Sequence, residues 1–391
     1  MEQASFLLLI LLSVIELPFF FFQRNPVGIF DIYLLTYFIV KLRFGGIKVG
    51  DWKPFLYIFA AYLAYLGYSV MQGERVFSSL LLVKYVEHLI LALVVVDYYQ
   101  NGPEEKQVFL DRLSLLFLGV LVYQVGYTQG WWPGVGDRYR LGLPFAMGTS
   151  SNPSGFSLGV FIVFHYELVM KRYGSSFLRV VVLVVALLAL WLSLSRVNLL
   201  AILVAFGGSV IISFANMKRG YWFIAGAALF VIVFYLFIID LIPDLGQAEK
   251  FVKIIRNPMS VFSDSSFTVR LNFFWPRAID DWLHSPSTFL FGWGYGTFPV
   301  VDGTYHYLLA NQGIIGFALF FTLWVAYPLY RWFSKPLLIL LIFFLVNAVS
   351  SDTMATSYRS IQIYIPLFVS LVALGRKKSI GAADPVPEEK K

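Results

Sequence analysis

His306 is the side chain of this sequence best suited to proton transfer, because an imidazole titrates near neutral pH and is the usual general base. It stands at the start of a long apolar segment, 306–330, and therefore at an expected edge of a membrane. From that edge it could remove a proton from a substrate hydroxyl. The alternative is an interfacial histidine with no catalytic role.

Two arginines could bind an anionic group such as a diphosphate, which a guanidinium grips through paired hydrogen bonds. Arg196 follows a very short connection, 193–195, between two strongly apolar segments, and this tight turn leaves it little freedom. Arg270 lies in a window, 267–283, whose apolar residues have helical spacing. The alternatives are that Arg196 snorkels to the interface and that the 267–283 helix lies on the outer leaflet, with its arginines on lipid headgroups.

The run Gly292-x-Gly294-x-Gly296 is a weak signal for a phosphate-binding loop, because no strand or βαβ unit precedes it. A flexible turn that returns the chain to the membrane is the preferred interpretation. No metalloprotease, nucleophile-elbow or P-loop motif occurs, and the chain has no cysteine. We therefore expect no metal site, no cofactor and no disulfide.

The elements that hold these residues are expected to be membrane helices. Of the 391 residues, 59% are hydrophobic and 14% are charged, whereas a soluble domain has roughly 45–50% and about 25%. Hydrocarbon requires each apolar segment to pair its own backbone groups, so the segments must be helices. The sequence predicts an all-α integral membrane protein with about 12 transmembrane helices. The expected spans are 5–22, 27–42, 54–71, 77–98, 108–129, 153–170, 177–193, 197–215, 221–243, 306–330, 336–351 and 360–375.

Loop charges predict the orientation, because positive residues collect on the cytoplasmic side. The positively charged loops contain Lys41, Arg43, Lys48, Lys53, Lys171, Arg172, Arg179, Lys218, Arg219, Arg331 and Lys335. Both termini are then cytoplasmic, in the bacterial inner membrane. One polytopic domain, 1–391, is expected, with a long periplasmic loop, 244–305, that contains short amphipathic helices, and a disordered cytoplasmic tail, 376–391. Nucleic-acid binding is excluded, because no basic stripe is long enough.

Several short motifs, in this order and on this topology, resemble the bacterial O-antigen polymerase and O-antigen ligase superfamily over residues 130–375. They are Arg140-Leu141-Gly142, Asn152-Pro153-Ser154, Ser195-Arg196, the Arg270 helix, Gly292-x-Gly294-x-Gly296-x-Phe298, His306-x-x-Leu309 and Gly313-Ile314-Ile315-Gly316. Tyr307 departs from the pattern, since many members have asparagine after the histidine.

The resemblance implies a glycosyltransferase whose donor is a glycan on undecaprenyl diphosphate, working at the periplasmic face without metal. His306 would be the general base, and Arg196 and Arg270 would bind the lipid diphosphate. Asp352 could orient His306 or balance an arginine. The further candidates for substrate binding are Arg140, Asn152, Arg277, Tyr305, Tyr358 and Arg359.

Polymerase and ligase differ in the acceptor, which is a second lipid-linked glycan for the first and lipid A–core for the second. Polymerisation of O-antigen, capsule or exopolysaccharide is preferred. Besides membrane lipids, a chain-length regulator is a possible partner. A flippase or transporter is the main non-enzymatic alternative, with a cavity lined by Lys84, Glu87, His88 and His165. A peptidoglycan polymerase of the shape–elongation–division type, relying on an outer-loop aspartate, is a further alternative.

Overall fold

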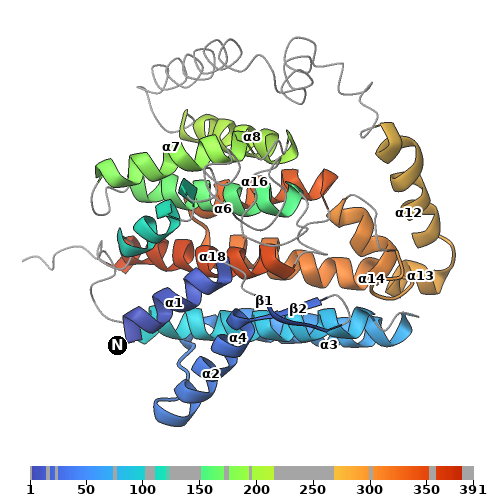
Figure 1. The fold of residues 1–391 in the computed structure, drawn as a ribbon. Helices are drawn as coiled ribbons and strands as arrows, with labels where there is room; N and C mark the ends of the chain where they lie inside the picture. The colour runs from blue at the N-terminus through green and yellow to red at the C-terminus, as the bar shows by residue number, and fades with distance from the viewer. Residues whose placement is uncertain are drawn as a thin grey trace, which may run out of the picture.

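The computed structural model describes residues 2–14, 18–22, 25–73, 77–101, 111–119, 121–122, 151–170, 176–192, 196–214, 268–298, 303–351 and 358–380. This part of the chain is almost entirely helical (Figure 1). Its elements are α1 (Glu2–Val14), β1 (Pro18–Phe22), β2 (Asn25–Gly28), α2 (Ile29–Phe44), α3 (Lys53–Gln72), α4 (Phe77–Asn101), α6 (Ser151–Met170), α7 (Ser176–Leu192), α8 (Arg196–Phe214), α12 (Trp275–Trp282), α13 (Pro286–Phe291), α14 (Thr304–Phe321), α15 (Tyr327–Trp332), α16 (Lys335–Ser350) and α18 (Tyr358–Ile380). Two π turns, Arg270–Phe274 and Thr322–Ala326, lead into α12 and α15.

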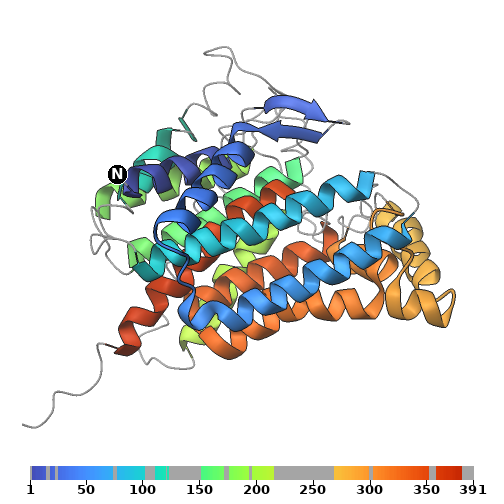
Figure 2. The same cartoon turned by 90° about the horizontal axis from the view of Figure 1, so that it is seen from below.

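The axes of most helices lie roughly parallel to one another, so the helices form a bundle (Figure 1). Helix α8 packs on α16, α6 packs on α7, and α18 packs on α4 and α6. Figure 2 shows α3 alongside α14, and these two helices are in contact. Helices α12 and α13 stand across one end of the bundle against α14, whereas α2 projects from it (Figure 1).

Two helical stretches, Gly50–Gln72 and Thr304–Trp332, are long and apolar enough to cross a membrane. Further apolar stretches of 10–17 residues lie within other helices. Large apolar side chains also face outward, with Leu35 50% exposed and Val184 58% exposed, whereas a helix facing water would be polar on that side. These features suit association with a membrane. The number of spans stays a prediction, and the expected span 221–243 lies outside the described residues.

The N-terminal segment differs from the prediction of one helix over 5–22. Helix α1 ends at Val14, and Pro18–Phe22 pairs antiparallel with Asn25–Gly28. Proline lacks a backbone N–H and clashes inside a helix, and a run of phenylalanines favours a strand. The predicted disordered tail also begins too early, because α18 continues to Ile380.

Candidate functional site

Buried hydrogen bonds bring three predicted elements to one end of the bundle. The Asn347 amide of α16 donates to Asn198 Oδ1 of α8, at 2.7 Å. The backbone N–H and the hydroxyl of Thr304, which begins α14, both donate to the carbonyl oxygen of Ser351, at 2.9 and 2.7 Å. The starts of α8 and α14 therefore meet at the end of α16. We call this region the His306 end.

Two more helices begin at the His306 end. Phe156, near the start of α6, lies 5.4 Å from Phe343 of α16, and Tyr166, ten residues later, lies 4.7 Å from Phe206 of α8, so α6 and α8 begin at the same end. Tyr364 of α18 contacts Phe344 of α16 at 6.1 Å, and Phe368, later in α18, lies 6.2 Å from Trp332, which precedes α16, so α18 runs opposite to α16. The starts of α6, α8, α14 and α18 thus direct the positive ends of their dipoles to one region, which favours an anion.

His306 is held in this region by an aromatic stack. Its ring lies 4.8 Å from that of Trp275, with an angle of only 6° between the planes. Nδ1 is buried and has no hydrogen-bond partner in the described part of the chain. The buried polar atoms that lack a partner in this part of the chain include Nδ1 of His306 and not Nε2, so Nε2 is the nitrogen left to meet a substrate. One free nitrogen on a fixed ring is the geometry that a general base needs.

Gly303 lies behind the imidazole and leaves no room for a side chain. A Cβ there would lie 2.8 Å from the carbonyl oxygen of Val349 and 3.0 Å from Nδ1 of His306. The backbone oxygen cannot move aside cheaply, so the added methyl would push the imidazole off its stack. The absence of a side chain at this position is therefore part of how His306 is placed.

We expect Gly303→Ala to lower the turnover of any reaction that uses His306 by about tenfold or more, because small misplacements of a catalytic group are costly. Initial rates of the purified variant would measure this. Gly207→Ala is the matched control, since a Cβ at Gly207 meets nothing within 4 Å. A Gly303→Ala variant with the turnover of Gly207→Ala would contradict the role of Gly303.

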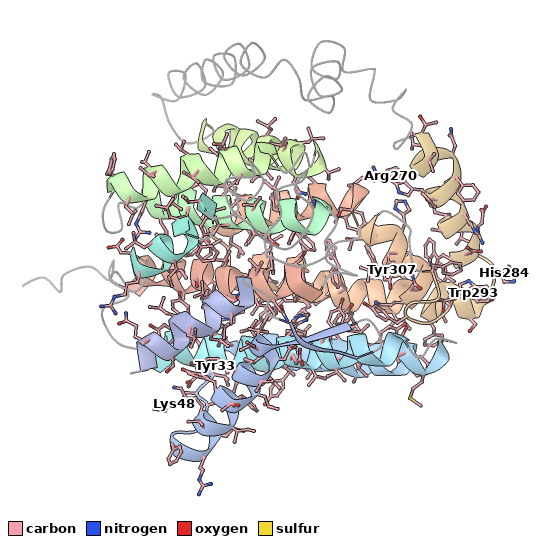
Figure 3. The ribbon with its side chains drawn as sticks, viewed as in Figure 1. Tyr33, Lys48, Arg270, His284, Trp293 and Tyr307 are labelled. Atoms are coloured by element: carbon pink, nitrogen blue, oxygen red, sulfur yellow. The ribbon has the colours of Figure 1, made fainter. Side chains whose placement is uncertain are left out.

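Arg270, a predicted site residue, belongs to the π turn directly before Trp275, so it lies on the same short segment of chain as the ring that stacks on His306. In Figure 3 its side chain extends from the start of this segment toward the bundle. Arg277 is 65% exposed and pairs with Asp281 at 3.8 Å, on the outer side of α12. The structure therefore places Arg270, and not Arg277, toward the His306 end.

Tyr305 has a packing role in this geometry. Its hydroxyl donates to the carbonyl oxygen of Leu345 in α16, at 2.9 Å, and its ring lies 6.1 Å from that of Phe317. This geometry gives no support to the prediction that Tyr305 binds substrate. The side chains of Asn152, Arg196, Tyr358 and Arg359 lie outside the described part of the chain, as do Arg140 and Asp352.

The glycine-rich run is a fixed docking turn and not a flexible one. Gly292, Gly294 and Gly296 have φ of 71°, 98° and 83°, a region that favours glycine. The side-chain amide of Asn311 in α14 pairs with both backbone groups of Phe298. Its Oδ1 accepts from the N–H of Phe298 at 2.9 Å, and its Nδ2 donates to the Phe298 carbonyl oxygen at 3.3 Å. This turn fixes the 268–298 segment against α14.

Helix α14 is interrupted where the turn docks. Gly313 has φ of 62° inside the helix. The backbone N–H groups of Trp293 and Gly294 donate to the carbonyls of Ala310 and Asn311, each at 3.0 Å. An interrupted helix that is buried in a protein needs such partners for its backbone groups. The polar Asn-Gln-Gly at 311–313, inside an apolar segment, is the sequence signal that could have revealed this contact.

Three of the residues considered for a transport cavity, Lys84, Glu87 and His165, have polar partners within the bundle. Lys84 of α4 contacts Asp31 of α2 at 2.5 Å and Glu87 at 3.1 Å. His165 Nε2 lies 3.1 Å from the hydroxyl of Ser114. These pairs suit a structural role within the bundle.

One charge assigned to a cytoplasmic loop lies elsewhere. Arg179 is completely buried in α7 and donates to Asp111 at 2.7 Å and to Ser114 at 3.1 Å. A carboxylate from the neighbouring segment compensates the buried guanidinium. The prediction of Arg179 as a loop charge was wrong.

Within the ranges that the structure describes, no three His, Cys, Asp or Glu side chains gather as metal ligands. The His306 end is the place where His306 and the starts of α8 and α14 come together, and Arg270 lies on the segment that carries Trp275. Comparison with protein families, with curated proteins and with solved structures finds no match to this chain.

Proposed function

We propose that this protein is a glycosyltransferase of the bacterial inner membrane that takes a glycan from undecaprenyl diphosphate at the periplasmic face. The observation that carries the proposal is the imidazole of His306, stacked on Trp275 with Nδ1 buried and Nε2 open, at the end where four helices begin. The preferred reaction is polymerisation of O-antigen, capsule or exopolysaccharide repeat units.

In the proposed reaction, Nε2 of His306 takes the proton of an acceptor hydroxyl. The hydroxyl oxygen forms a bond to the anomeric carbon of the donor, and the bond from that carbon to the diphosphate oxygen breaks. The leaving diphosphate gains negative charge, which Arg270 and Arg196 would stabilise together with the positive helix ends. The proton leaves His306 to water when the product departs.

The surroundings suit a substrate that is half lipid and half sugar. The polyprenyl chain would stay among membrane lipids against the outward apolar side chains, and its diphosphate would meet the charged groups at the His306 end. The acceptor would be the sugar of a second lipid-linked glycan. A ligase that uses lipid A–core needs the same residues and remains the alternative. A chain-length regulator would be a further partner.

Transport is the second candidate, because interrupted helices such as α14 also form binding sites in transporters. Loss of the gene distinguishes the two. If the protein is a transferase, unpolymerised lipid-linked repeat units accumulate at the periplasmic face. A glycosidase added to spheroplasts then cleaves them. If the protein is a flippase, the units accumulate at the cytoplasmic face and are protected until the cells are lysed.

A further inference from the structure

We propose that Trp275 is a positioning residue for His306, and that the π turn Arg270–Phe274 aims Trp275 and Arg270 at the imidazole together. The catalytic meaning of this inference rests on the proposed function. Its geometry does not, and the two can be tested separately.

The π turn changes which residues share a side of the segment. The backbone N–H of Trp275 donates to the carbonyl oxygen of Arg270, a bond between residues five apart. In an α-helix, residues five apart are separated by about 140° around the axis. In a π turn they lie roughly one above the other, because the bond closes one full turn. The extra residue therefore brings Arg270 to the side of Trp275, which is the side that faces His306.

The same turn explains why the residues that are buried differ from the apolar face expected for the window 267–283 at 3.6 residues per turn. That face includes Leu271 and Phe274, yet Leu271 is exposed and Phe274 is only partly buried, whereas Ala278 is buried. π turns are uncommon and occur often at functional sites. Here the turn makes the aromatic face of Trp275 available to the imidazole.

Trp275 then determines which nitrogen of His306 reacts. The indole covers one face of the imidazole, and Gly303 approaches Nδ1 so closely that a Cβ would lie 3.0 Å from it. The ring is thus held with Nδ1 inward and Nε2 outward. Without the indole, the ring could rotate about its side-chain bonds, and the open nitrogen would lose its fixed direction.

The geometry can be tested in a chain that has no cysteine of its own. We would express Arg270→Cys with His306→Cys, and Arg277→Cys with His306→Cys as the matched control, and treat membranes with a short bifunctional thiol reagent. The inference expects cross-linking of the 270/306 pair and little of the 277/306 pair. Equal yields for both pairs, or a higher yield for 277/306, would overturn it.

Insertion of one alanine between Leu271 and Asn272 in the first pair tests the register that the π turn sets. The insertion places position 270 six residues before Trp275 and should rotate it away by about 100°. We expect loss of the 270/306 cross-link in protein that elutes as the parent does. An unchanged cross-link yield would show that the π turn does not set this register. If the insertion prevents folding, the comparison of positions 270 and 277 still decides the inference.

The positioning role predicts a separation of kcat from KM. Trp275→Leu should lower kcat by about tenfold or more with donor KM within about twofold, because it loosens a group that acts in the transition state. Trp275→Phe keeps an aromatic face and should recover most of that loss. Equal kcat for Leu and Phe would contradict positioning by stacking. If wild-type protein transfers no glycan, the proposed function fails, whereas the cross-linking result stands.

Discussion

His306→Ala is expected to lower kcat/KM for glycan transfer by about 10²–10⁴-fold, the usual contribution of a general base. The variant should still insert into the membrane, because the buried Nδ1 of the His306 side chain makes no hydrogen bond within the described part of the chain and the ring stacks on Trp275. Purified protein and a lipid-linked donor would give kcat/KM directly. Elution and thermal unfolding of the variant would show that its fold is intact.

The matched control is His284→Ala. His284 is an exposed histidine on the segment 268–298, which also carries Trp275. Its ring lies 5.5 Å from that of Trp293 on the outer side of this segment (Figure 3). We expect its loss to change kcat/KM by less than about threefold, as for a surface residue. Equal losses for the two variants would remove the special role of His306, and so would an unchanged rate for His306→Ala.

Gly292→Ala and Gly313→Ala are each expected to destabilise the fold by at least about 2 kcal/mol, from backbone strain and from a clash. Gly292 has φ of 71°, and its Cβ would lie 2.4 Å from the carbonyl carbon of Asn311. Gly313 has φ of 62°, and its Cβ would lie 2.4 Å from the carbonyl oxygen of Leu290. Both contacts are with backbone atoms, which can move aside only if the glycine-rich turn separates from α14.

Thermal unfolding in detergent would measure this effect, with Gly207→Ala as the reference. Gly207 lies inside α8 with an ordinary helical backbone and open space around its Cβ position, so alanine should be neutral or should stabilise by up to about 1 kcal/mol. Midpoints for Gly292→Ala or Gly313→Ala that match this reference would show that the turn is not docked as described.

The positions of many helices could be predicted from apolar runs alone. Helices α3 and α16 begin and end within one residue of the segments 54–71 and 336–351. This succeeds because hydrocarbon requires each segment to satisfy its own backbone, so length and apolarity decide the structure locally. The N-terminal hairpin escaped the same argument, since Pro18 interrupts a run that is apolar throughout.

The residues of the site were predictable by type, but their arrangement was not. His306 stood out at the edge of an apolar segment, and Arg270 stood out in a window whose apolar residues have helical spacing. Trp275 did not, because its contact with His306 joins positions 31 residues apart through a π turn that a period of 3.6 cannot reveal. Asn311 was missed for a related reason: its role depends on a turn that docks from another segment.

The most direct test of the proposed transferase is reaction of purified wild-type protein with a synthetic undecaprenyl-diphosphate glycan, in EDTA and with no other protein. The account predicts longer lipid-linked glycans and one undecaprenyl diphosphate released for each bond formed. If glycan is transferred only to added lipid A–core, the protein is still a transferase, but it is a ligase and not a polymerase. No product with either acceptor, from protein that unfolds cooperatively, would contradict the central claim.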